Sequence, residues 1–219
     1  MTGILELIAL ILILMFSVVI HEVAHGTVAS WLGDPTAKYS GRLTLNPLKH
    51  LDLFGSFLLP LGLFLATGGR AVLGYAKPVP INPNNFSDQK YGSAKVAVAG
   101  AGSNIVLALI FGLILRFLLG FGLVSPAAST MYDMFTYIVA INLLLAIFNL
   151  VPIPPLDGSH VLFAFLPPSQ DDFKIFLQKY GWAVLLFLLF FPIGNFNFLE
   201  LLSTIVGYVY KLIVGFPLL

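Results

Sequence analysis

The sequence has no cysteine and few charged residues. The absence of cysteine excludes disulfides and thiolate metal ligands. Only 10% of the 219 residues are charged, whereas a soluble domain carries about 25%. Too little polar surface is therefore available to cover a globule of this size in water. With a net charge of +1, the composition also gives no support to a nucleic-acid-binding function.

Apolar residues make up 58% of the chain, and their arrangement predicts a membrane protein. Long apolar runs predict helices over about 5–31, 94–122 and 127–150, each long enough to cross a bilayer. A break rich in Pro, Gly and Asn at 192–197 divides the last stretch into two short helices over about 181–216. We therefore expect an all-α, multi-pass integral membrane protein in a lipid bilayer. One membrane domain covers residues 1–219, with its core at about 5–165.

The segment between the first two long helices differs from the rest of the chain. Residues 36–50 combine β-branched and turn residues and predict one or two short strands. Residues 51–68 are apolar but interrupted by glycine and proline, and basic residues lie on both sides of them. Because basic loops tend to face the cytoplasm, a re-entrant or interfacial hairpin is favoured here. A full membrane span is the alternative.

The most informative motif is His21-Glu22-Val23-Ala24-His25 on the first predicted helix. The spacing of four residues puts both imidazoles on one helical face, where two ring nitrogens can bind one Zn²⁺ ion. Glu22 lies beside them and could deprotonate a water molecule on the metal. The alternative is a pair of buried histidines satisfied by hydrogen bonds. Three ionisable groups inside a membrane helix are costly unless something binds them, so a metal site is favoured.

A catalytic zinc site usually has three protein ligands, and without cysteine the third must be His, Asp or Glu. Asp157 is a candidate because a proline-rich stretch interrupts the backbone just before it. Broken backbone at membrane depth is tolerated where it is buried in protein or lines a wet cavity. The alternative for Asp157 is a loop aspartate in water at the membrane face.

Two further polar residues lie near this break. His160 could stabilise developing charge near the metal or could be an interfacial residue. Asn149 could hold a substrate carbonyl or stabilise an oxyanion, or it could simply end the third helix. Asn142, two helical turns earlier, is interpreted as a helix–helix hydrogen-bonding residue. A polar channel that admits water is expected to be lined by Asn149, His160 and the 41–50 loop.

Three stretches together resemble the site-2 protease family of intramembrane zinc metalloproteases, in its compact form without PDZ or CBS domains. They are H21EVAH25, A99GAGSN104 and N149LVPIPPLDG158, with support from G41RLTLNP47 and H50LD52. The second stretch has Ala101 where the family usually has proline. The resemblance covers about residues 15–165.

The resemblance implies that His21, His25 and Asp157 hold one catalytic Zn²⁺ ion and that Glu22 is the general base. It also implies that Asn149 handles the substrate near the metal. A three-helix catalytic core is implied, with the active site nearer the cytosolic face of the cell membrane. Extended segments within 41–82 would present a transmembrane protein or peptide substrate as a strand.

Two rival functions use the same residues differently. A non-hydrolytic membrane metal-binding or metal-transport protein would need His21, His25 and Asp157 but not Glu22. It would also favour further acidic or histidine residues along a path, whereas 94–150 contains only Asp133. A purely structural membrane subunit would require all four polar residues to be incidental.

Overall fold

The computed structural model describes residues 3–52, 58, 62, 65, 77–126 and 129–218. Its helical elements, in chain order, are α1 (Gly3–Trp31), α2 (Thr36–Tyr39), η1 (Pro47–Lys49), η3 (Pro83–Asn85), α4 (Gly92–Gly120), α5 (Thr130–Asn149), α6 (Gly158–Phe165), η4 (Pro168–Gln170), α7 (Asp171–Phe190) and α8 (Phe198–Val214). Four helical stretches are long and apolar enough to cross a membrane, namely α1, α4, α5 and Pro168–Phe190. The predicted all-α polytopic membrane fold is confirmed.

The first helix, α1, has its polar side inside the protein and its apolar side outside. It buries mostly small or polar residues, which are Ser17, Val19, His21, His25, Gly26 and Ala29. It exposes large apolar side chains along its N-terminal half, which are Ile4, Leu5, Leu7, Ile8, Ile11, Leu12, Leu14 and Phe16. Such an arrangement suits lipid as the solvent, since the apolar face needs no protein cover and the polar residues face a protein interior.

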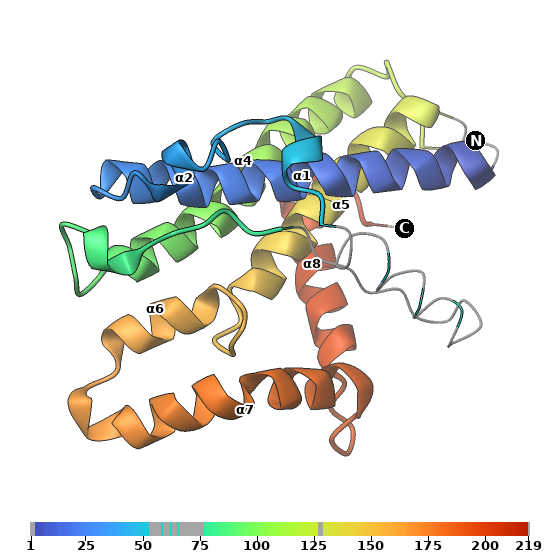
Figure 1. Ribbon diagram of the computed structural model, residues 1–219. Coiled ribbons are helices and arrows are strands. Elements are labelled where there is room, and N and C mark those ends of the chain that lie inside the picture. The colour runs from blue at the N-terminus through green and yellow to red at the C-terminus, as the bar shows by residue number, and fades with distance from the viewer. Residues whose placement is uncertain are drawn as a thin grey trace.

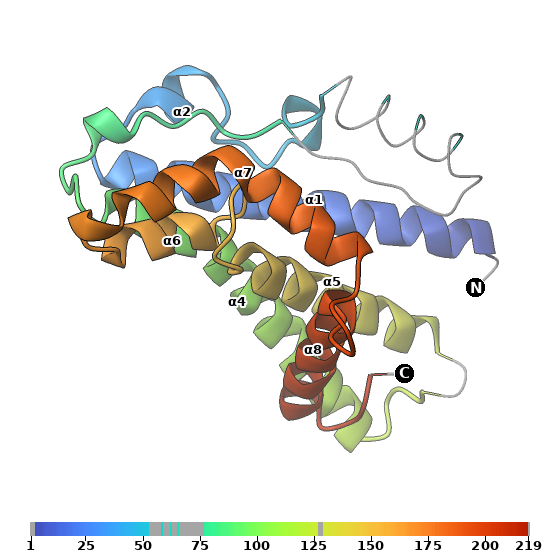
Figure 2. The same ribbon diagram turned by 90° about the horizontal axis from the view of Figure 1, so that it is seen from below.

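The helices α1, α4 and α5 form the core. In Figure 1, α4 crosses behind α1 and lies beside α5. The helix α8 packs against the C-terminal half of α4 and against α5. Contacts between α1 and α4 pair His25 with Val96 and His21 with Asn104, so these two helices are antiparallel. Figure 1 shows α6 between α1 and α7, and Figure 2, seen from below, shows α7 in front of α1. The predicted three-helix core is therefore present.

The last helix, α8, packs against α4 and α5. A cluster of buried apolar residues joins α4, α5 and α8, and within it Tyr210 and Thr136 share a hydrogen bond of 3.0 Å. Arg116 of α4 donates to the carbonyl oxygens of Leu212 and Ile213 at the end of α8. A cation at a helix C-terminus complements its partial negative charge. These contacts lie away from the histidines of α1.

Two sequence expectations about secondary structure are wrong. Residues 36–50 contain the short helices α2 and η1 and no strand, because the Asp34 and Asn46 side chains accept backbone N–H groups and start helical turns. The first C-terminal helix begins at Asp171, ten residues before the expected start at 181. Two aspartates in its first turn favour that earlier start. The predicted break at 192–197 is present, with an isolated bridge between Ile193 and Phe196.

The hairpin expected at 51–68 lies almost entirely outside the described residues, as does most of the 41–82 stretch beyond Asp52. The part that is described again, from Lys77 to Asn82, runs past α1 without helical turns (Figure 1).

Candidate metal centre

Two matching stripes of residues bring α1 and α4 together. On α1, Ser17, His21 and His25 recur every four residues and face the same side. On α4, Gly100 lies one turn before Asn104 on the side that meets these histidines. The candidate metal centre begins at this helix crossing.

Gly100 is required by the close approach of the two histidines. A Cβ atom at this position would lie 2.4 Å from His25 Cε1 and 2.7 Å from His21 Cε1. The missing side chain also leaves the carbonyl of Val96, one turn earlier, open to the His25 ring. His25 Nδ1 donates to that carbonyl oxygen at 2.7 Å. Because a carbonyl only accepts, His25 carries its proton on Nδ1.

His21 is held in the same way by a side chain. Its Nδ1 lies 2.6 Å from Asn104 Oδ1, and Asn104 uses its Nδ2 to donate to Asn142 Oδ1. His21 therefore also carries its proton on Nδ1. The two Nε2 atoms face each other at 3.0 Å, and a neutral imidazole with its proton on Nδ1 carries a lone pair on Nε2. Two such lone pairs at this distance repel each other unless a cation lies between them.

Asp157 completes the group from a distant part of the chain. Its Oδ2 lies 3.1 Å from Nε2 of His21 and 3.1 Å from Nε2 of His25. The turn that presents Asp157 requires glycine next to it, because a Cβ at Gly158 would lie 2.2 Å from the carbonyl oxygen of Leu150. Asp157 Oδ2 is buried and has no hydrogen-bond donor. A buried carboxylate oxygen without a donor is costly unless it binds a cation.

The three atoms form a nearly equilateral triangle with sides of 3.0, 3.1 and 3.1 Å. Tetrahedral ligands at about 2.0–2.1 Å from a zinc ion lie about 3.3 Å apart. The sides of the triangle are within a few tenths of an ångström of that value, and two nitrogens with one oxygen suit zinc chemically. In the part of the chain that the structure describes, only His21, His25 and Asp157 group in this way.

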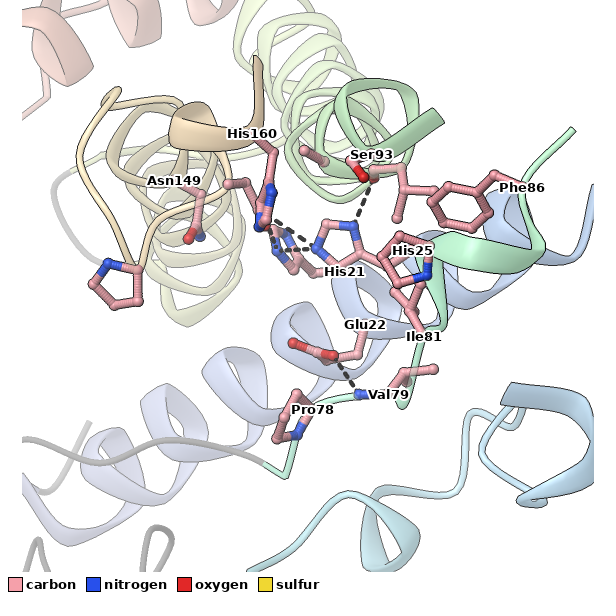
Figure 3. Close-up of a pocket in the computed structure, with 15 residues that line it drawn as sticks. His21, Glu22, His25, Pro78, Val79, Ile81, Phe86, Ser93, Asn149 and His160 are labelled. Carbon is pink, nitrogen blue, oxygen red and sulfur yellow. Dashed lines mark hydrogen bonds and ion pairs between the residues drawn. The ribbon is translucent and has the colours of Figure 1, made fainter. Parts of the chain in front are cut away.

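Glu22 lies beside this group and faces a pocket of about 440 Å³ (Figure 3). Its Oε2 accepts the N–H of Val79 at 2.8 Å. Val79 stands between Pro78 and Pro80, which have no N–H, so it is the only donor of that tripeptide. A small residue on α1 permits this approach, since a Cβ at Gly26 would lie 2.9 Å from Val79 Cγ1.

Asn149 and His160 both line the same pocket (Figure 3). Asn149 Nδ2 donates to the carbonyl of Leu145 at 2.9 Å, within its own helix. His160 is exposed at the pocket surface. The expectation that the 41–50 loop lines this space is wrong, because the segment from Pro78 to Phe86 takes its place. His50 is buried and donates from Nε2 to the carbonyl of Thr44.

The segment 77–85, here named the strap, is anchored on both sides of Val79. Lys77 N donates to the carbonyl of His50 at 2.8 Å, and Asn82 N donates to Asp34 Oδ2 at 2.7 Å. Asp34 is fully buried and also accepts the Asn85 side chain. Burial alone would raise the pKa of Asp34, but the hydrogen bonds from Thr36, Asn82 and Asn85 together hold it below its usual value. Asp34 thus fixes the strap over the pocket.

Sequence reasoning missed the importance of Asn104, Val96 and Asp34. An asparagine inside an apolar helix is a signal that was available for Asn104, but the same signal fits any helix–helix hydrogen bond. The contact of Val96 with His25 uses the main-chain carbonyl of Val96, and every residue type has such a carbonyl, so the sequence gives no signal for it. Asn142, interpreted from the sequence as a helix–helix hydrogen-bonding residue, does form such a bond with Asn104.

The fold and the site together define a multi-pass membrane protein with a group of residues that could hold a metal ion. The family model of peptidase family M50 matches residues 9–130 and 124–189. The chain therefore belongs to peptidase family M50, which confirms the resemblance to the site-2 proteases. The family is one of zinc metalloproteases, and the triangle of His21, His25 and Asp157 can hold the ion.

Similar proteins in two bacteria have names that agree with this family. The chain is 36% identical over 197 residues to "Putative zinc metalloprotease YwhC" of Bacillus subtilis, which covers 89% of this chain and 86% of that protein. It is 30% identical over 188 residues to "Putative zinc metalloprotease Rip2" of Mycolicibacterium smegmatis, covering 85% of this chain and 68% of that protein. No solved structure matches the chain.

Proposed function

We propose that this protein is an intramembrane endopeptidase that hydrolyses peptide bonds of transmembrane proteins or peptides within or near the bilayer. The observation that carries the proposal is the triangle of His21 Nε2, His25 Nε2 and Asp157 Oδ2, with sides of 3.0, 3.1 and 3.1 Å, beside Glu22. His21, His25 and Asp157 hold one zinc ion. When bound, zinc supplies a Lewis acid that polarises a carbonyl and lowers the pKa of water.

Glu22 acts as the general base and acid in this proposal. Its carboxylate takes a proton from the attacking water and delivers it to the leaving amine. The N–H of Val79 holds one carboxylate oxygen at 2.8 Å, which leaves the other oxygen available to the pocket. Asn149 and His160 line the pocket and bind the substrate near the scissile bond. One N–H of Asn149 Nδ2 donates to the Leu145 carbonyl, which leaves its second N–H and its Oδ1 for the substrate.

The location of the site supports cleavage close to one membrane face. The site lies near the last turns of α1 and the first turns of α4. Basic residues gather in the segments at that end, which are Lys38, Arg42, Lys49, Lys77, Lys90 and Lys95. Since basic loops favour the cytosol, the active site lies nearer the cytosolic face, and the cell membrane is the proposed location.

The alternative, a non-hydrolytic metal-binding or metal-transport protein, is less well supported. Such a protein has no use for Glu22 in the pocket beside the triangle. No observation in the described part of the chain favours this alternative.

The direct test is Glu22→Gln in proteoliposomes that contain a panel of single-span peptides, with products identified by mass. The amide keeps the size of the side chain and still accepts from Val79, so zinc binding is retained while cleavage falls by at least about 100-fold. Glu6→Gln, about 24 Å away on the same helix, is the matched control and keeps full activity. Equal cleavage by the Glu22→Gln variant and the unaltered protein would remove Glu22 from its role.

A further inference from the structure

A chain of buried polar side chains extends from His21 away from the pocket, across all three core helices. Its members are Ser17 on α1, Asn104 on α4 and Asn142 on α5, with 3%, 0% and 1% of their surface exposed. Three polar side chains at this depth in a membrane helix bundle are costly unless each is fully satisfied. Their hydrogen bonds donate in one consistent direction, from His21 through Asn104 and Asn142 to a main-chain carbonyl of α5.

The direction is set by a main-chain carbonyl. Asn142 Nδ2 lies 2.8 Å from the carbonyl oxygen of Ile138, which can only accept, so this end of the Asn142 amide must be the donor. The same Nδ2 donates to Ser17 Oγ at 2.9 Å. The other end of the amide, Asn142 Oδ1, is therefore an acceptor. It faces Asn104 at 2.8 Å.

The amide of Asn104 repeats this constraint. Its Nδ2 donates to Asn142 Oδ1 and to the main-chain oxygen of Ser17 at 3.3 Å. Its Oδ1 is thereby turned towards His21 Nδ1, at 2.6 Å. An oxygen in this place holds the proton of His21 on Nδ1 and leaves Nε2 free for a metal. Had the Asn104 amide the opposite orientation, its N–H would face His21 Nδ1 and favour the proton on Nε2, which could then not bind zinc.

We propose that Asn142 is a positioning residue of the metal centre, which fixes the tautomer and ring orientation of His21 through Asn104. The inference rests on the proposed zinc site and names two residues outside the ligand set. His25 needs no such relay, because the Val96 carbonyl holds it directly. Hydrogen-bond partners of metal-bound histidines typically contribute 10–100-fold to metal affinity.

The test is a double-mutant cycle on zinc affinity, measured with the full-length protein in detergent by competition with a chelator. Asn104→Leu weakens zinc binding about 10–100-fold. Asn142→Leu weakens it about 3–10-fold, because Asn104 then retains only the Ser17 carbonyl as acceptor. The double variant is no weaker than Asn104→Leu alone, since Asn142 acts only through Asn104.

Two controls separate this role from general packing. Thr136→Val removes another buried polar group of α5, at a distance from the site, and leaves zinc affinity unchanged. A second readout uses the Co²⁺-substituted protein, in which the imidazole N–H protons of His21 and His25 give separate shifted resonances. The His21 proton exchanges slowly in the unaltered protein and faster in Asn142→Leu.

The results that overturn the inference are distinct from those that overturn the proposed function. If the unaltered protein binds no zinc, the proposed function fails. If it binds zinc but a folded Asn142→Leu variant keeps the same affinity, or the two single losses add in full, the positioning role of Asn142 is wrong. Should the leucine variants not fold, a fast-exchanging His21 N–H in the unaltered Co²⁺ protein overturns the inference by itself.

Discussion

Gly100→Ala is the sharpest single change that the packing of α1 on α4 suggests. The new methyl group would lie 2.5 Å from His25 Nε2 and 2.4 Å from His25 Cε1. Ordinary contacts between carbon and such atoms are at least about 3.4 Å, so the ring must move by about 0.9–1.0 Å or the helices must separate. Zinc sites tolerate changes in ligand distance of about 0.2 Å.

The displacement is therefore about five times what the metal site can absorb, and both histidines are affected. We expect zinc affinity to fall by at least about 100-fold, equivalent to about 2.7 kcal/mol. The helix itself does not suffer, because alanine favours an α-helix over glycine by up to about 1 kcal/mol. A loss of zinc without loss of helical content is thus the expected pattern.

The assay is zinc affinity by chelator competition, together with circular dichroism of the purified protein in detergent. Gly102→Ala is the matched control, since it lies two residues away on α4 and a Cβ there has no neighbour within 4 Å. It keeps the zinc affinity of the unaltered protein. If Gly100→Ala bound zinc as tightly as Gly102→Ala, the close packing of α4 on the histidines would be refuted.

Two further predictions concern the strap. Val79→Pro removes the N–H that holds Glu22, so we expect the rate of peptide cleavage to fall at least about 10-fold with unchanged zinc content. Val79→Ala keeps the N–H and most of the activity. Equal cleavage rates of the two variants in peptide assays would contradict this role of the Val79 N–H. Asp34→Asn loosens the strap and lowers the stability of the protein by about 1–3 kcal/mol at pH 7. Because the pKa of Asp34 is lower in the folded than in the unfolded protein, its ionised form stabilises the fold above the unfolded pKa of about 4. This contribution is lost as pH falls through the folded pKa, so the difference in thermal midpoint between the two proteins narrows below about pH 4, and a constant difference would speak against it.

The sequence predicted the long helices well because their signals are strong and local. Apolar runs of more than about 18 residues leave few alternatives to a membrane helix. The breaks around them contain Gly and Pro, as at Gly33 after α1 and Gly194 before α8, where the backbone has positive φ. The expected start of α7 is ten residues too late, because the first half of this helix carries charged residues and its composition resembles that of a loop.

The candidate site could be predicted as far as the identity of the residues, but not their supports. His21 and His25 share a helical face by spacing alone, and Asp157 follows a proline-rich break. The hydrogen bonds and packing contacts that hold these side chains in place depend on which atoms of other helices reach them. Gly100 is important because it has no side chain that would collide with the histidines. Only the antiparallel packing of α4 on α1 brings Gly100 against them.

The central claim is tested most directly by the metal content and X-ray absorption spectrum of the purified protein. The account predicts one zinc ion per chain with two imidazole nitrogens at about 2.0–2.1 Å and oxygen ligands at about 2.0–2.2 Å, and loss of tight binding in Asp157→Ala. A protein that holds no zinc, or one whose zinc site is unchanged in spectrum and affinity after Asp157→Ala, would contradict it.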